Sequence, residues 1–198
     1  MKTFVIIILV LLIFPLLSIE PEITYKDSLS DSLAQETSED TLMKPYIVVD
    51  LRNFRLFLYE NEELNREYPI ATGKNMGDKR MVGDCRTPLG DFIIEKIESS
   101  VHWVYDYGDG NGYVSAYGPW FIRLETHADQ TKSGKAWTGI GIHGTHDEES
   151  IGTRISRGCL RMHSEDLLEL VDFLKNLPDL HIKVYIREEL EIDEDFDH

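Results

Sequence analysis

The most informative stretch of this chain is Ile142–Thr145 (IHGT), together with Ser156–Met162 (SRGCLRM). It places His143 and Cys159 in a glycine-rich setting that is flanked by arginines. An unperturbed thiol is only a few per cent thiolate at neutral pH, so a nucleophilic cysteine needs a base that accepts its proton. An imidazole can be that base, and nearby guanidinium groups favour the resulting anion. The pattern predicts that the histidine and the cysteine meet in the fold.

Around this stretch, short apolar segments alternate with polar turns, which is typical of β structure. Strands are expected at residues 46–50, 54–59, 66–72, 91–97, 103–105, 120–124, 139–143 and 181–187. One segment, about residues 164–176, is expected to be the main helix, because its apolar residues recur at three- and four-residue spacing and Ser164 can cap it. Many short strands with one main helix predict a mainly β domain, either a sandwich or barrel-like.

The two ends of the chain differ in composition from its middle. Residues 1–19 hold one lysine before an apolar block, which fits a secretory signal peptide or an uncleaved membrane anchor. Residues 20–43 are rich in Ser, Thr, Asp and Glu and are expected to form a disordered tether. The folded domain is expected at residues 44–187, and residues 188–198 form an acidic tail. We therefore expect export to the periplasm or cell envelope, with the protein either secreted or held by a membrane tether.

The charge balance excludes some classes of partner. The chain has 20 Lys and Arg against 36 Asp and Glu, a net charge of −16. Nucleic-acid binding rewards clustered basic residues, so no nucleic acid is expected as a partner. Docking on anionic lipid headgroups through a basic face is disfavoured for the same reason.

The chain contains two cysteines, Cys85 and Cys159. In an exported protein, a structural disulfide between them is a common alternative to a free thiol. That bond would exclude catalysis, because an oxidised Cys159 cannot act as a nucleophile. The residues around Cys159 favour the free thiol, and a reversible link that switches activity off is a third option.

The histidine and cysteine segments, His143–Thr145 and Ser156–Met162, resemble the signature of the YkuD-type L,D-transpeptidases. Thr87–Phe92 (TPLGDF) resembles the T-P-x-G-x-F element of that family. Pro45–Leu58 is similar to the family's opening hairpin, and Tyr68–Gly73 to the strand that follows. The resemblance covers about residues 44 to 187.

The resemblance implies a cofactor-independent cysteine acyltransferase that acts on peptidoglycan stem peptides. Cys159 would attack the carbonyl of the third residue of a tetrapeptide stem, release the terminal D-alanine and form a thioester. An amine from a neighbouring stem would then give a 3–3 crosslink, whereas water would make the enzyme an L,D-carboxypeptidase. His143 would be the general base and later the acid, oriented by the backbone carbonyl of Gly144.

Four more residues complete the expected site. The amides of Gly158 and Cys159 could form an oxyanion hole. Ser156 is a candidate for hydrogen bonding to the substrate or for support of the site. Arg161 could bind the substrate carboxylate in a bidentate manner. Many family members have His at the position of Arg157 and Asn at that of Arg161, so which residue supports the oxyanion and which the carboxylate stays open.

Two alternatives from other functional classes stay open. The spacing of His143, His146, Cys159 and His163 (H-x2-H…C-x3-H) could form a zinc site, since His and Cys both bind zinc. The domain could also be a non-catalytic cell-wall binding module whose thiol is locked in a disulfide. The catalytic reading requires no metal ion.

Overall fold

The computed structural model of this protein describes residues 44–106, 108 and 110–190. The expected signal peptide or anchor at 1–19, the tether at 20–43 and residues 191–198 of the acidic tail lie outside the described residues. Within the described part of the chain, no helix is both long enough and apolar enough to cross a membrane.

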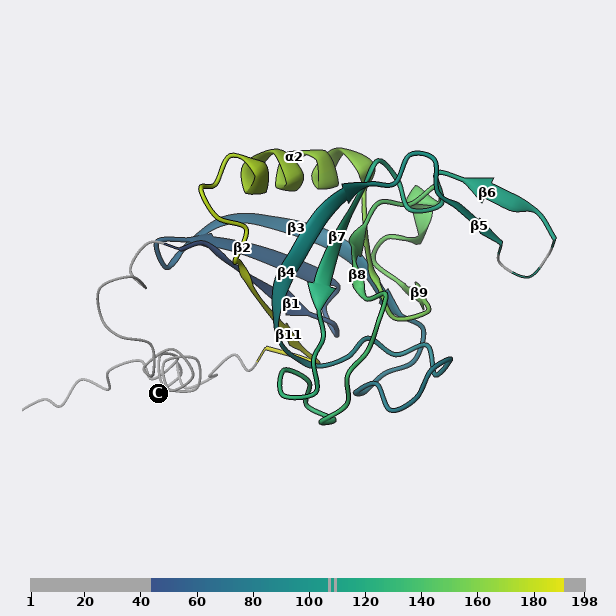
Figure 1. Cartoon of the computed structure of the whole chain (residues 1–198), viewed down its shortest axis with the longest axis horizontal. Helices are drawn as coiled ribbons and strands as arrows, with labels where there is room; N and C mark the ends of the chain where they lie inside the picture. The colour runs from purple at the N-terminus through teal and green to yellow at the C-terminus, as the bar shows by residue number, and fades with distance from the viewer. Residues whose placement is uncertain (1–43, 107, 109, 191–198) are drawn as a thin grey trace, which may run out of the picture. The chain divides into compact units, whose positions relative to one another are not determined.

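A nine-stranded sheet makes up most of the fold (Figure 1). Its strands are β1 (Tyr46–Asp50), β2 (Arg55–Glu60), β3 (Glu63–Gly73), β4 (Gly90–Ser99), β7 (Trp120–Glu125), β8 (Gly141–His143), β9 (Arg154–Ser156), β10 (Leu160–Met162) and β11 (Lys183–Arg187). Their order in the sheet is β10-β8-β7-β4-β11-β1-β2-β3-β9, and β10 also pairs with β3. Because of this extra pairing, eight strands close into a barrel and β9 lies outside the ring. The predicted mainly β, barrel-like domain with one main helix is confirmed.

The interior of the barrel is filled by side chains that alternate along the strands. In β2, for example, Leu56 and Leu58 are almost completely buried, whereas Arg55 and Phe57, which alternate with them, are only partly buried. This period of two is the pattern from which the strands were predicted. The buried set continues through β8 and β10, so the strands that carry the expected site also belong to the core.

The main helix, α2 (Ser164–Lys175), packs on the barrel through Leu167, Leu170, Val171 and Leu174. Its first turn is not capped by Ser164, because the N-cap position is occupied by His163. The carboxylate of Glu148, from the short 3-10 helix η1 (Glu148–Ser150), accepts hydrogen bonds from the backbone and the hydroxyl of Ser164. A negative charge at this end of a helix also complements the helix dipole.

A second, two-stranded sheet consists of β5 (Val104–Asp106) and β6 (Gly112–Val114). It forms a hairpin that projects from the barrel between β4 and β7 (Figure 1). The T-shaped contact of Tyr105 with Tyr117, 5.8 Å between ring centroids, ties the hairpin to the segment that precedes β7.

Candidate active site

His143 and Cys159 come together because two short parallel strands carry them. β8 and β10 pair with Leu160 opposite Ile142 and Arg161 opposite His143. Side chains alternate between the faces of a strand, so Cys159, which directly precedes β10, shares a face with Arg161 and His143. Leu160 and Ile142 point the other way and are fully buried. The register therefore places the thiol, the imidazole and one guanidinium on the wall of one cavity.

The imidazole of His143 is held by its own backbone neighbour. Its Nδ1 lies 2.6 Å from the carbonyl oxygen of Gly144. A carbonyl can only accept, so Nδ1 carries the proton and Nε2 is left as the basic nitrogen. The ring of Phe121 stacks on the imidazole at 5.4 Å, and Tyr117 meets it edge-on at 4.9 Å. This geometry fixes both the tautomer and the orientation of the ring.

Burial keeps the imidazole neutral. His143 is 4% exposed, and this desolvation lowers its pKa to about 3, although the hydrogen bond to Gly144 acts in the opposite direction. The positive charge of Arg161 lowers the pKa further. A neutral imidazole with a free Nε2 is the form that can accept a proton.

The thiol of Cys159 is also neutral at rest. Burial of the thiol raises its pKa. The nearby arginines were expected to lower the pKa of the thiol, but their effect is smaller than that of burial. The opposing influences are the hydrogen bond from the Gly141 backbone and the positive charges of Arg161, Arg123 and Lys79. The sulfur donates to the carbonyl oxygen of Gly139 at 3.3 Å, and no hydrogen bond between described residues joins it to His143. Proton transfer to the imidazole therefore requires the thiol to turn away from Gly139.

The loop before Cys159 is organised by Ser156, which is 2% exposed. Its hydroxyl donates to the carbonyl of Cys159 at 2.5 Å and accepts from the backbone of Gly158 at 3.0 Å. The N–H of Gly158 is thus already engaged, which leaves the amide of Cys159 as the remaining candidate of the two expected to form an oxyanion hole. Ser156 lines the cavity, and its hydroxyl is engaged with the loop backbone on either side of it, so it supports the position of the nucleophile.

Three cations line the cavity, which has a volume of about 420 Å³. Arg161 is 8% exposed, whereas Arg157 is exposed and its guanidinium lies 5.6 Å from the ring centroid of Tyr105. Lys79 is the third cation, from the loop between β3 and β4. The described lining contains no carboxylate, so the cavity has a positive character that suits an anionic ligand.

Lys79 was missed at the sequence level. It lies more than 60 positions before His143 in the chain, inside a glycine-containing loop without periodicity. The local signal was a lysine followed five residues later by Asp84, with Gly83 beside it, which is too weak to mark a site. Its place in the cavity depends on long-range packing against Trp137, whose ring centroid lies 5.2 Å from Nζ.

The family model of the L,D-transpeptidase catalytic domain, YkuD, matches residues 44–186 of this chain. The chain belongs to this family. It is 35% identical over 133 residues to a Bacillus licheniformis protein named as L,D-transpeptidase YkuD, covering 67% of this chain and 62% of that protein. The Bacillus subtilis protein of the same name is 31% identical over 133 residues, with the same coverage. The chain thus spans just under two thirds of the length of these relatives.

Several solved structures share the fold. The NMR structure of the catalytic domain from the E. faecium L,D-transpeptidase has a TM-score of 0.50 and 23% identity, covering 73% of this chain and 98% of that one. The structure of Bd1075 from Bdellovibrio bacteriovorus has a TM-score of 0.52 and 22% identity, and the match covers 78% of this chain and 51% of that one. At these identities the likeness supports the architecture of the barrel.

The two alternative sites expected from the sequence do not form among the described residues of this L,D-transpeptidase domain. Both cysteines are free thiols, so no disulfide locks Cys159. No group of three or more His, Cys, Asp or Glu residues in the described part could hold a metal ion. Instead, Nδ1 of His163 lies 2.6 Å from Glu148, and the ring of His146 stacks on Tyr113.

Proposed function

We propose that this protein is an L,D-transpeptidase that forms a thioester between Cys159 and a peptidoglycan tetrapeptide stem. The observation that carries the proposal is one cavity lined by Cys159, by His143 with its Nε2 available, and by three cations without a carboxylate. Membership in the L,D-transpeptidase family supports the same reaction.

In the first half of the reaction, the sulfur of Cys159 attacks the carbonyl carbon of the third stem residue. Nε2 of His143 accepts the thiol proton as the sulfur–carbon bond forms. The negative charge that develops on the carbonyl oxygen needs a preorganised donor, for which the N–H of Cys159 is the candidate. The carbon–nitrogen bond then breaks, and the imidazolium returns the proton to the amine of the departing D-alanine.

In the second half, an amine attacks the thioester carbonyl and gives its proton to His143. The sulfur–carbon bond breaks, and the thiolate takes the proton back, which restores the neutral pair. With an amine of a second stem the product is a crosslink, and with water it is a tripeptide. The same machinery of Cys159 and His143 serves both outcomes, so the acceptor decides between transpeptidase and carboxypeptidase activity.

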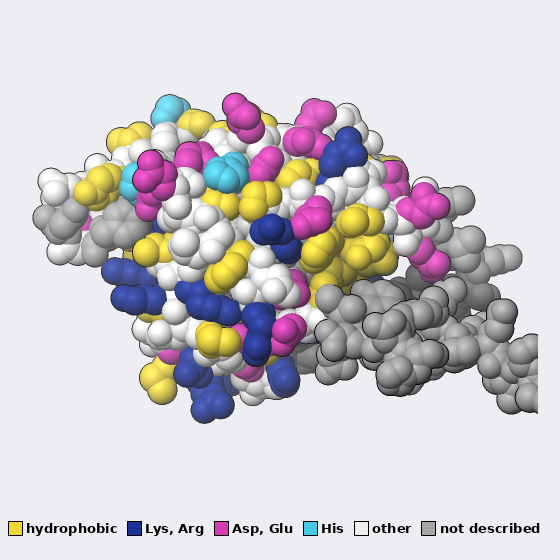
Figure 2. All heavy atoms as spheres, turned by 180° about the vertical axis from the view of Figure 1, so that it is seen from behind, with side chains coloured by type: hydrophobic (Ala, Val, Ile, Leu, Met, Phe, Trp, Pro, Cys, Tyr) yellow, Lys and Arg dark blue, Asp and Glu magenta, His cyan; other side chains and the backbone are white. Residues whose placement is uncertain are grey.

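The charge distribution supports an anionic peptide as substrate. The chain as a whole carries a net charge of −16, yet its cavity is cationic. Figure 2 shows Lys and Arg side chains gathered on the lower left of one face, with Asp and Glu mainly along its upper side. Arg161 is buried beside the nucleophile and is the candidate for the stem carboxylate, while the exposed Arg157 lies at a more open part of the cavity.

Incubation of the reduced protein with a disaccharide tetrapeptide tests the proposal. We expect intact-mass spectrometry to find a tripeptide thioester on Cys159 together with free D-alanine. Cys159→Ala is expected to form no adduct, whereas Cys85→Ser is expected to form it normally. Adding an amine acceptor converts the adduct into a crosslink, and its omission leaves only slow hydrolysis. Absence of both the adduct and D-alanine from the reduced, folded protein would refute the proposed reaction.

We further propose that residues 1–43 export the domain to the cell envelope, either as a cleaved signal peptide or as an anchor, followed by a tether. The composition of that segment supports this assignment. Fusion of residues 1–43 to a reporter that is active only outside the cytoplasm tests it, and an inactive reporter would exclude export by this segment.

A further inference from the structure

We infer that the buried pair Lys79–Asp84 is a positioning device, which sets how readily Cys159 gives up its proton and fixes the loop that walls the cavity. The inference rests on the proposed role of Cys159 as the nucleophile. It concerns two residues that have no place in the His143–Cys159 pattern, on the loop of residues 74–89 between β3 and β4.

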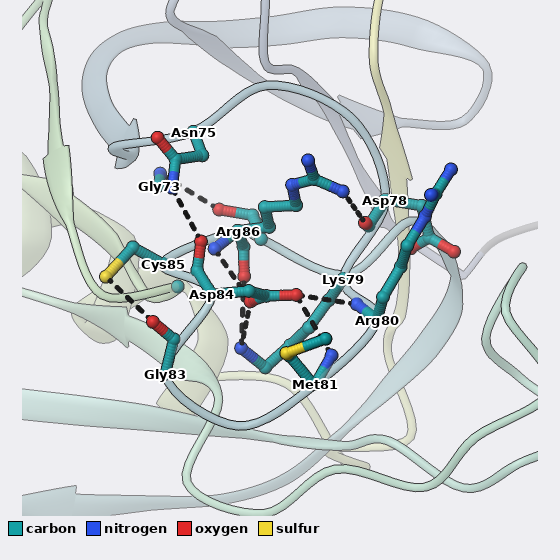
Figure 3. Close-up of polar contacts among 12 residues, drawn as sticks. Gly73, Asn75, Asp78, Lys79, Arg80, Met81, Gly83, Asp84, Cys85 and Arg86 are labelled. Atoms are coloured by element: carbon teal, nitrogen blue, oxygen red, sulfur yellow. Dashed lines mark hydrogen bonds and ion pairs between the residues drawn. The ribbon is translucent and has the colours of Figure 1, made fainter.

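The carboxylate of Asp84 is the centre of this loop (Figure 3). It accepts a hydrogen bond from Nζ of Lys79 at 2.8 Å and from the backbone N–H groups of Arg80, Met81 and Arg86 at 2.7, 3.0 and 3.1 Å. Burial alone would raise the pKa of Asp84, but these four donors outweigh it and hold the pKa well below its usual range. Asp84 is therefore ionised at every physiological pH, and its carboxylate holds the loop together through these four hydrogen bonds.

The ion pair is unusually buried for this molecule. The side chains of Lys79 and Asp84 are 7% and 12% exposed, whereas those of the ion pair between Arg66 on β3 and Glu169 on α2 are 58% and 53% exposed. Desolvation of two charges can cost more than their attraction returns, so a buried pair is weak evidence for a purely stabilising role. A role of the charges in the electrostatics of the cavity, which Lys79 lines, is the alternative to pure stabilisation.

The loop reaches the nucleophile in two ways. The carbonyl oxygen of Arg86 packs against Gly158, where an added Cβ would lie only 2.9 Å from it. Lys79 lines the cavity together with Cys159, and its positive charge favours the thiolate. Asp84 opposes that influence, because its negative charge lies beside the same ammonium group. The pair therefore balances the electrostatic field at the sulfur.

Other ionisable groups also act on the sulfur, and the test leaves all of them in place. Arg161 on β10 and Arg123 on β7 favour the thiolate through their charge, and His143 on β8 and the exposed Arg157 line the same cavity. Removing one member of the loop pair at a time therefore isolates its contribution. Loss of Lys79 and loss of Asp84 must shift the ionisation of Cys159 in opposite directions if charge is what the pair supplies.

The experiment measures the alkylation rate of Cys159 by iodoacetamide as a function of pH, in the Cys85→Ser background so that one thiol is followed. In Lys79→Met we expect the midpoint of the profile to rise and the rate near neutral pH to fall about three- to tenfold. In Asp84→Asn we expect the midpoint to fall. Lys79→Arg keeps the charge and should restore the profile of the Cys85→Ser parent.

Lys74→Met is the matched control, because Lys74 is an exposed lysine of the same loop that does not line the cavity. Its profile should coincide with that of the parent. Shifts of both test variants in the same direction, or no shift in either, would show that the pair only supports the loop and would overturn the inference. If Lys79→Met does not fold, Asp84→Asn alone decides. An unchanged or raised midpoint of its alkylation profile would contradict the inference that Asp84 offsets the charge of Lys79.

Alkylation requires no peptidoglycan, so this result is independent of the proposed reaction. A protein with the opposite shifts that forms no thioester with tetrapeptides would refute the proposed function, while the effect of the pair on the ionisation of Cys159 would still be established. A protein that forms the thioester but has identical alkylation profiles in all variants would refute the inference about the Lys79–Asp84 pair and leave the proposed function standing.

Discussion

Substitution of Gly158 by alanine should damage the site more than its size suggests. The φ angle of Gly158 is +137°, which side chains of L-amino acids rarely adopt, and this strain costs roughly 1–3 kcal/mol. A Cβ would also lie 2.9 Å from the carbonyl oxygen of Arg86, a backbone atom that cannot swing away. Overpacking of this kind adds roughly 1–3 kcal/mol. We expect Gly158→Ala to lower the free energy of unfolding by roughly 2–6 kcal/mol in total.

Gly152→Ala separates the two contributions. Gly152 has a φ angle of +84° but no atom within 4 Å of its Cβ position, so only the backbone penalty of about 1–2 kcal/mol applies. In thermal unfolding followed by circular dichroism, Gly158→Ala should therefore unfold about 5–10 °C below Gly152→Ala. Its acylation by a tetrapeptide should be slower by at least about tenfold, because displacement of the loop moves the adjacent Cys159. Equal unfolding temperatures would refute the assigned contact with Arg86.

Three further predictions follow from the contacts of the nucleophile and its base. Ser156→Ala removes the acceptor of Gly158 N–H and the donor to the Cys159 carbonyl, so denaturant titration should give a loss of about 1–3 kcal/mol. The alkylation rate of wild-type Cys159 should keep rising with pH beyond the range in which ordinary thiols ionise, because burial raises the pKa of this thiol. A rate that already levels off at mildly acidic pH would reveal a preformed thiolate and contradict this prediction. The pKa of His143 is about 3 when folded and near 6.5 when unfolded, so its contribution to stability is complete above about pH 6.5 and is lost as the pH falls toward 3. Stability should drop by up to about 3 kcal/mol near pH 4 from this group, and His143→Gln should flatten that dependence in denaturant titrations at several pH values.

The elements that could be predicted from sequence are those with enough residues to show a period. The helix at about 164–176 is observed at Ser164–Lys175, and the hairpins formed by β1, β2 and β3 were expected from alternation. β3 begins earlier than expected, at Glu63, because Asn61 and Glu62 both adopt positive φ angles, 54° and 64°, and make a tight turn. The strands β6, β9 and β10 have three residues each and were not expected, whereas the equally short β5 and β8 were expected from the apolar segments 103–105 and 139–143. β10 is a strand because β8 and β3 flank it, and that is a property of the closed barrel.

In the candidate site, too, features set by residue type and short-range sequence could be predicted, whereas features set by the conformation of the loops could not. The residue types and spacing of His143 and Cys159 pointed to one cavity, because the chemistry of an activated thiol needs both. The orientation of the imidazole by Gly144 could be expected, since the two residues are adjacent in the chain. The engagement of the Gly158 amide by Ser156 could not, because it depends on the loop conformation. The contribution of Lys79 depends on a contact between two loops that no local pattern encodes.

The ionisation states of the site constrain the order of events in the proposed reaction. Burial lowers the pKa of His143 and raises the pKa of Cys159, so transfer of the proton before attack is opposed from both sides. The proton must therefore move while the sulfur–carbon bond forms, when the negative charge passes to the carbonyl oxygen of the substrate and does not stay on sulfur. Arg161 on strand β10 and Lys79 on the loop after β3 both line the cavity in which that charge would develop. Strands and loop thus contribute together: the site holds a neutral thiol and imidazole, and cations from β10 and from the loop after β3 would stabilise the charge that develops when a bound peptide is attacked.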